Sequence, residues 1–250
     1  MNDYVSLHVL IVVSTFFIAG IVKGVTGMGL PTVAMGILGA ITSPVSAASL
    51  LIIPSFVTNF WQLFTGSNFL LLIKRLWMMM LCIVVGTLAG AWFLTSANTK
   101  YASVGLGSAL VLYAIHGLWA KPLSVSARFE RVLSPVVGLV TGAITGVTGV
   151  FTLPAVPYLQ ALGLSKDDLI QALGLSFTVS TIALAAGLAR GGAFHLENIT
   201  LSVLAIIPSL LGMWLGTTVR ERISAATFRR WFLIFLAILG LELAGHQFFF

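Results

Sequence analysis

The residues best suited to bind a ligand lie in an eight-residue pattern that the chain carries twice. GIVKGVTG begins at Gly20 and GAITGVTG begins at Gly142, 122 residues later, and five of the eight positions are identical. Glycine tolerates positive φ and lets a ligand approach the backbone, so each pattern predicts a break between two helices. A helix that opens after such a break presents free N–H groups and the positive end of its dipole, and both bind anions.

Side chains within the two patterns support the same chemistry. Lys23 is the one cation in either pattern, and Thr26 and Thr148 each place a hydroxyl at a break. Pro31 and Pro154 follow, early in the next predicted helix, where a missing N–H does least harm. An alternative for Lys23 is a place at the cytoplasmic interface, if the first segment spans completely. We expect one small anion between the two breaks, bound by Lys23, Gly24, Thr26, Gly27, Gly29, Gly146, Thr148 and Gly149.

Further polar residues lie on the apolar segments that follow each break. Asn59 and Gln62 are one helical turn apart in the stretch PSFVTNFWQ, and Ser176, Thr178 and Thr181 occupy the approximate counterpart in the second half. Buried amides often form hydrogen bonds between helices, and Ser or Thr can bond back to the preceding turn. We count these five residues as candidate substrate ligands and keep helix packing as the alternative.

Composition places these segments in a bilayer. Hydrophobic residues make up 58% of the 250 residues, charged residues make up 8%, and the mean hydropathy is +1.07. Such values exclude an ordinary soluble domain. The single cysteine, Cys82, excludes paired-thiol chemistry, and the histidines have no partner at metal-ligand spacing, so we expect no metal and no cofactor. The basic residues are scattered over loop positions, which argues against nucleic acid.

The apolar segments form two sets of five. They lie near 4–22, 28–42, 44–66, 76–95 and 100–120, and again near 132–145, 150–164, 168–189, 199–219 and 228–249. A repeat this long that occurs twice is a duplicated half, and duplicated halves with broken segments are typical of secondary transporters. We therefore predict repeats over 1–120 and 132–250, joined by a cytoplasmic linker over 121–131.

Loop charges predict that the halves have opposite orientations in the membrane. If Lys74 and Arg75 are cytoplasmic, the corresponding loops of the second half must change sides, and the arginines at 220–230 agree. Ten basic residues then lie inside and Lys100 and Arg190 outside, as the positive-inside rule requires. Both termini are predicted to be external. The fold class is an all-α polytopic membrane protein with two inverted repeats, each a broken or re-entrant hairpin followed by three transmembrane helices.

The predicted segment from Val132 to Thr145 decides where the second hairpin turns. Its 14 residues reach only about 21 Å, against a hydrocarbon core of about 30 Å. We therefore expect this hairpin to turn within the membrane, close to the first break. The Gly-x-x-x-Gly pairs at Gly86 and Gly212 are interpreted as helix-packing motifs.

The glycine-rich breaks followed by proline, the stretch PSFVTNFWQ and the ending ATFRRWFLIFLAILGLELA resemble the TauE/SafE (TSUP) family of sulfite exporters over nearly the whole chain. The resemblance implies a bacterial inner-membrane transporter of sulfite or a related sulfur-containing or organic anion, and not an enzyme. The second loop, GVTGVFTLP, is bulkier than the glycine runs common in that family, so the resemblance does not fix the substrate. An anion channel, and less favoured a membrane enzyme, are the alternatives. Proton coupling through His116 and Glu242 and a homodimer stay open.

Overall fold

The computed structural model describes residues 2–64, 66–96, 99–119, 124–193, 196–222 and 225–249. Within these ranges the chain is helical and has no strand, which confirms the predicted all-α class. Residues 120–123 of the predicted linker lie outside the described part. The helices are α1 (Asn2–Thr26), α2 (Leu30–Ile41), α3 (Pro44–Leu63), α4 (Phe69–Ser96), α5 (Thr99–Trp119), α6 (Ala127–Thr148), α7 (Ala155–Ala161), α8 (Lys166–Arg190), α9 (Leu196–Leu204), α10 (Ile206–Arg222) and α11 (Ala225–Phe249).

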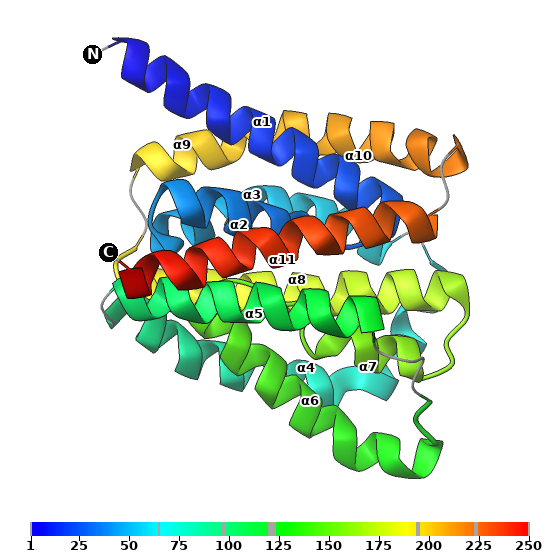
Figure 1. Cartoon of the computed structure of the whole chain (residues 1–250). Coiled ribbons are helices and arrows are strands. Elements are labelled where there is room, and N and C mark those ends of the chain that lie inside the picture. Colours follow the sequence, from blue (N-terminus) through cyan, green and yellow to red (C-terminus); the bar gives the residue numbers. More distant parts are fainter. Residues whose placement is uncertain are drawn as a thin grey trace.

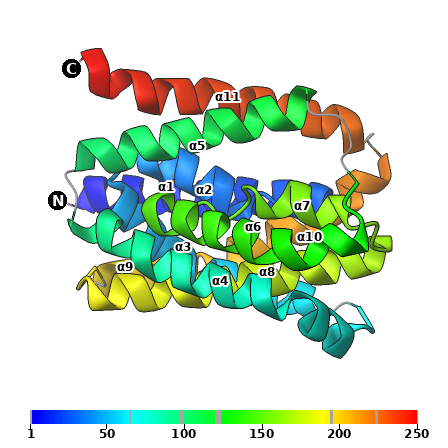
Figure 2. The same cartoon turned by 90° about the horizontal axis from the view of Figure 1, so that it is seen from below.

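The helices lie side by side along one common direction. α1 packs along α10 on one side of the molecule, and α4 packs along α6 on the opposite side, with α2, α3 and α8 between these pairs (Figure 1). α5 and α11 form a third pair that covers α2 (Figure 2). Each central helix is therefore shielded by other helices.

Seven stretches of the described residues are long and apolar enough to cross a membrane. They are Leu7–Thr26, Pro44–Leu63, Phe69–Thr95, Tyr101–Trp119, Arg128–Thr148, Lys166–Arg190 and Asn198–Arg220, and the last of these combines α9 and α10. Large apolar side chains such as Trp92 and Trp214 are about 70% exposed on the outer helices, where they would face lipid. The protein is a multi-pass membrane protein, as its composition predicts.

Both glycine patterns end a helix, as predicted. Gly27 has φ +76°, Gly29 has φ +101° and Gly149 has φ +71°, all in the left-handed region that favours glycine. Pro31 lies in the first turn of α2, whereas Pro154 is the residue just before α7. The backbone thus reverses after Thr26 and after Thr148 in the two halves.

The prediction of a short segment over 132–145 is wrong. α6 has 22 residues, which span about 33 Å, because Arg128 and Glu130 extend the helix beyond the apolar run. The short members are instead the returning helices. α2 has 12 residues and α7 has 7, about 18 Å and about 10 Å, so both reverse turns lie at depth between the two ends of the bundle.

Glycines let the outer helix pairs approach at backbone distance. A Cβ at Gly216 would come within 3.0 Å of the Gly24 Cα, and a Cβ at Gly90 would come within 3.0 Å of the Gly146 Cα. Gly86 and Gly212 make equivalent close contacts with α6 and α1, which confirms the packing interpretation of both Gly-x-x-x-Gly pairs. The first five residues of each repeated pattern therefore lie at a helix crossing, and only the residues after them form the break.

Charged residues gather at one end of the bundle. The ends of α4, α6, α8 and α10 that hold Lys74, Arg131, Lys166 and Arg220 lie together, opposite the end where both chain termini lie (Figure 1). α1 and α6 run in opposite directions between these ends, as an inverted relation requires. Which end faces the cytoplasm, and whether the two halves are related by inversion, stay predictions.

Candidate functional site

A pocket of about 250 Å³ lies beside the first break, between the C-terminal ends of α1, α3 and α10 and the first turns of α8. Its lining residues Asp167 and Arg220 lie toward the end of the bundle that carries most of the basic residues. Its walls include the apolar side chains of Trp61, Ile170 and Met213. The full lining is Lys23, Gly24, Gly27, Trp61, Gln62, Asp167, Ile170, Met213, Thr217 and Arg220.

Lys23 is the buried cation of this pocket. Its side chain is only 3% exposed, and its ammonium donates a hydrogen bond to the Asn59 Oδ1. Among the described residues Lys23 forms no ion pair with a carboxylate. Lys23 therefore does not extend into solvent, and its role as a substrate ligand stays a prediction.

Asn59 and Gln62 connect this lysine to the second half of the chain. The Asn59 amide donates to the Thr181 hydroxyl at 3.4 Å. One turn further on, the Gln62 amide donates to the Gly27 carbonyl oxygen at 3.0 Å and to the Ile170 carbonyl oxygen at 3.1 Å. The turn at Gly27 is thereby fixed between α3 and α8, and these hydrogen bonds bring Lys23, Gly27, Asn59, Gln62 and Thr181 close together.

The threonines of the two breaks bond to their own backbone. The Thr26 Oγ1 lies 2.8 Å from the Val22 carbonyl oxygen and 2.6 Å from that of Met28. The Thr148 hydroxyl donates to the Ile144 carbonyl oxygen at 2.7 Å and accepts from the Val150 N–H at 3.2 Å. Both hydroxyls stabilise the ends of their helices in this structure.

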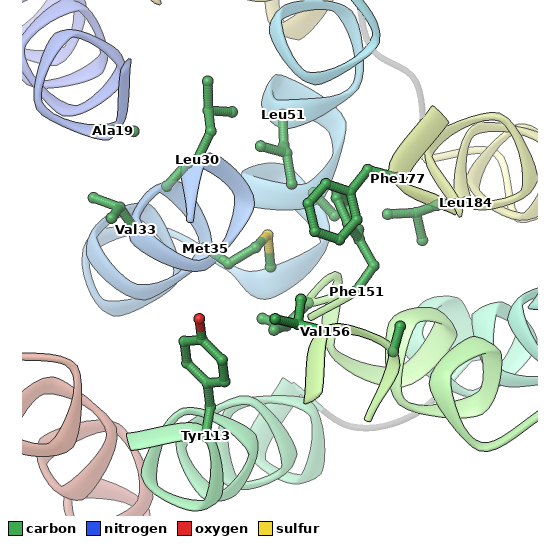
Figure 3. Close-up of a cluster of buried hydrophobic side chains, with 14 of the residues drawn as sticks. Ala19, Leu30, Val33, Met35, Leu51, Tyr113, Phe151, Val156, Phe177 and Leu184 are labelled. Carbon is green, nitrogen blue, oxygen red and sulfur yellow. The ribbon is translucent and has the colours of Figure 1, made fainter. Parts of the chain in front are cut away.

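The second break lies against apolar side chains. Met35 of α2 points toward the rings of Phe151 and Phe177 (Figure 3), and the two ring centroids are 5.3 Å apart. A Cβ at Gly149 would come within 2.9 Å of the Met35 Sδ, so Met35 packs directly on this turn. No residue of the second break lines the pocket at Lys23. The predicted sharing of one anion site by both breaks therefore stays a prediction.

The remaining predicted ligands have other neighbours. Gly24 lines the pocket but also packs on α10, and Gly146 packs on α4. Gly29 packs on Val22 and Phe232, and the Thr178 hydroxyl donates to the Gly174 carbonyl oxygen at 2.7 Å. Ser176 is fully buried on α8. None of these arrangements tests substrate contact, which stays a prediction for each residue.

Sequence reasoning did not assign six of the pocket residues to a site. They meet only through the packing of α3, α8 and α10, so no spacing along the chain indicates them. The Ser-Lys-Asp-Asp stretch at the start of α8 was the one available signal, because Ser165 caps this helix and Asp167 follows in its first turn. The unassigned residues are Trp61, Asp167, Ile170, Met213, Thr217 and Arg220.

The site combines the cations Lys23 and Arg220 with the Asp167 carboxylate, the Gln62 amide and apolar walls. Within the described residues no group of three or more His, Cys, Asp or Glu side chains could hold a metal ion. No curated protein and no solved structure matches the chain. Residues 12–243 match the family described as Sulfite exporter TauE/SafE. Because this match covers nearly the whole chain, the protein belongs to the sulfite exporter TauE/SafE family of membrane transporters.

Proposed function

We propose that this protein carries sulfite, or a related sulfur-containing or organic anion, across the membrane, and that the anion binds at Lys23. The proposal rests on the burial of the Lys23 ammonium, which forms no ion pair with a carboxylate among the described residues, in a pocket that Arg220 and Asp167 also line. Asn59 solvates this ammonium through one amide oxygen but adds no opposite charge.

Electrostatics favours an anion at this position. Removing an ammonium from water costs several kcal/mol after relaxation, and an opposite charge is the usual compensation. An anion about 4 Å from the Lys23 Nζ would gain about 4 kcal/mol at an effective dielectric constant of about 20. A bound anion would supply the opposite charge that no ion pair gives to Lys23 among the described residues, while the Asp167 carboxylate of the same lining opposes an anion there.

The approach to the pocket also favours anions. The pocket lies toward the end of the bundle where Lys74, Arg131 and Lys166 lie, and Arg220 and Asp167 form part of its wall. A positive potential at an opening raises the local concentration of anions and speeds their association. We propose that this end is cytoplasmic, which places both termini outside a bacterial inner membrane and makes export the direction that begins at this end.

A carrier accounts for this arrangement better than a channel. No residue of the second break lines the pocket, and Met35, Phe151 and Phe177 are buried beside that break. Alternating access would require the two inverted halves to rearrange around the bound anion. The flux through a carrier saturates with anion concentration and shows counterflow. A channel shows no counterflow.

The experiment is a flux panel with purified protein in liposomes. Sulfite, sulfate, thiosulfate, sulfoacetate and lactate are compared as substrates, with saturation and counterflow measured for each anion that moves. We expect saturable sulfite or sulfonate flux that the Lys23→Gln variant loses. The matched control is Arg190→Gln, which removes an exposed cation at the opposite end of α8 from the pocket. Equal flux of all five anions without saturation would replace the carrier with a channel.

A further inference from the structure

A second hollow lies away from the Lys23 pocket, where α5 ends and α11 begins. It has a volume of about 520 Å³. α5 and α11 form the outer pair of the bundle, and these two ends lie near the basic end of the molecule (Figures 1 and 2). The lining residues are Gly117, Leu118, Trp119, Arg229, Arg230, Leu233 and Ile234.

Two arginines determine which ligands this hollow can bind. Both Arg229 and Arg230 line it and are exposed, and no acidic side chain is among the lining residues. By contrast, the guanidinium of Arg75, which lines a hollow at the start of α4, is paired with the Glu130 carboxylate at 2.7 Å. Two guanidinium groups, with no carboxylate among the lining residues, have the charge to bind a phosphate. Each planar guanidinium can donate two parallel hydrogen bonds to phosphate oxygens.

The residues around the hollow place it at the level of lipid headgroups. Trp119 is 73% exposed and Trp231 is 68% exposed, and exposed tryptophan is typical of the membrane interface. Arginine beside such tryptophan lies where phospholipid phosphates lie. The hollow is therefore at the correct depth for a phosphate that belongs to a lipid.

Apolar stripes continue from the hollow along both helices. On α11, Ile234, Ile238 and Leu241 follow Arg230 at spacings of four, four and three, which puts them on one face. On α5, Ile115 and Leu112 precede Trp119 at the same kind of spacing. Ile238, Leu241 and Leu112 are each at least 60% exposed, so acyl chains can lie along these stripes below the headgroup.

We infer that this hollow binds a phospholipid with a net negative headgroup, its phosphate on Arg229 and Arg230 and its acyl chains along α5 and α11. This inference goes beyond the transport proposal and does not depend on it, because the hollow shares no lining residue with the Lys23 pocket. A diester phosphate with an additional uncharged headgroup, such as phosphatidylglycerol, has the required chemistry.

The test is the affinity of the full-length protein for phosphatidylglycerol, measured in detergent by native mass spectrometry. Each basic residue near an anionic lipid contributes about fivefold in affinity, so Arg229→Gln with Arg230→Gln should weaken binding about thirtyfold. The control removes two exposed charges at the same end, Arg128→Gln with Lys166→Gln, and should retain wild-type affinity. An equal loss in both double variants would show that net charge alone is responsible and would overturn the site.

Two further measurements keep the inference testable if the arginine variant does not fold. In the wild-type protein, brominated phosphatidylglycerol should quench tryptophan fluorescence more than brominated phosphatidylcholine, and Trp119→Phe should reduce that difference. Equal quenching by both lipids would contradict the inference. Inorganic phosphate should not displace the bound lipid at millimolar concentration. If it does, the hollow is a phosphate site and not a lipid site.

Discussion

Replacing Lys23 by glutamine should weaken anion binding without destabilising the protein. Lys23 is 3% exposed, bonds to Asn59 and forms no ion pair among the described residues, so its charge is not needed to neutralise a protein carboxylate. Removing an uncompensated buried charge also removes its desolvation cost. Glutamine can still donate a hydrogen bond to Asn59. The melting temperature should therefore stay the same or rise.

The expected loss of affinity follows from the contact that disappears. A hydrogen bond from a charged donor to an anion is typically worth about 1.5–3 kcal/mol, which corresponds to about 10- to 150-fold in the dissociation constant. Lys23→Arg keeps the charge but must fit a larger, planar group into the same buried space, so it should recover only part of the affinity. Arg190→Gln, at an exposed position at the other end of α8, should match the wild type.

The assay combines equilibrium binding of radiolabelled sulfite to purified protein with thermal unfolding followed by tryptophan fluorescence. A binding role predicts that affinity falls while stability holds or rises. A purely structural role predicts that both fall together. Lys23→Gln with unchanged sulfite affinity, at wild-type expression, would refute the binding role and leave Lys23 as a packing or interfacial residue.

Three other changes test the surrounding structure. Asn59→Asp should place a carboxylate against the Lys23 ammonium, raising the melting temperature and abolishing sulfite binding; retention of both wild-type values would argue against the pocket. Gly216→Val should cost about 1–3 kcal/mol or more, because a Cβ there meets the backbone of α1, whereas Gly245→Ala has open space; gel filtration and unfolding compare them, and a stable Gly216→Val protein would contradict the crossing. In a Cys82→Ser background, an impermeant thiol reagent should label Asn2→Cys but not Ser126→Cys in intact cells, and the reverse would invert the proposed orientation.

The breaks could be predicted from the sequence because their cause is local. A positive φ at Gly27, Gly29 and Gly149 depends on residue type, and Pro31 fits only the start of the helix that follows. The polar residues Asn59 and Gln62 were also recognisable, since an amide in an apolar segment needs a partner. The partners themselves, the Gly27 carbonyl oxygen and Thr181, required the packed structure.

Features that depend on packing between distant segments were not predictable in this way. Hydropathy predicted that one apolar segment begins at Val132. α6 begins five residues earlier, at Ala127, since charged residues continue a helix beyond an apolar run. Gly24 and Gly146 look like parts of the break, and only the positions of α10 and α4 show that they pack at crossings. The bulky Phe151 of the second loop packs among apolar side chains, which a motif alone does not indicate.

Diffraction from crystals soaked in selenite tests the central claim most directly, because selenite has the shape and charge of sulfite and its selenium scatters anomalously. A Cys82→Ser protein avoids reaction of selenite with the one thiol. We expect one strong anomalous peak in the pocket, within about 4 Å of the Lys23 Nζ and close to Gly27 and Gln62, and no such peak in Lys23→Gln crystals. A peak beside Thr148 and Gly149 with none at Lys23, or a peak at Lys23 that survives the substitution, would contradict the proposed site.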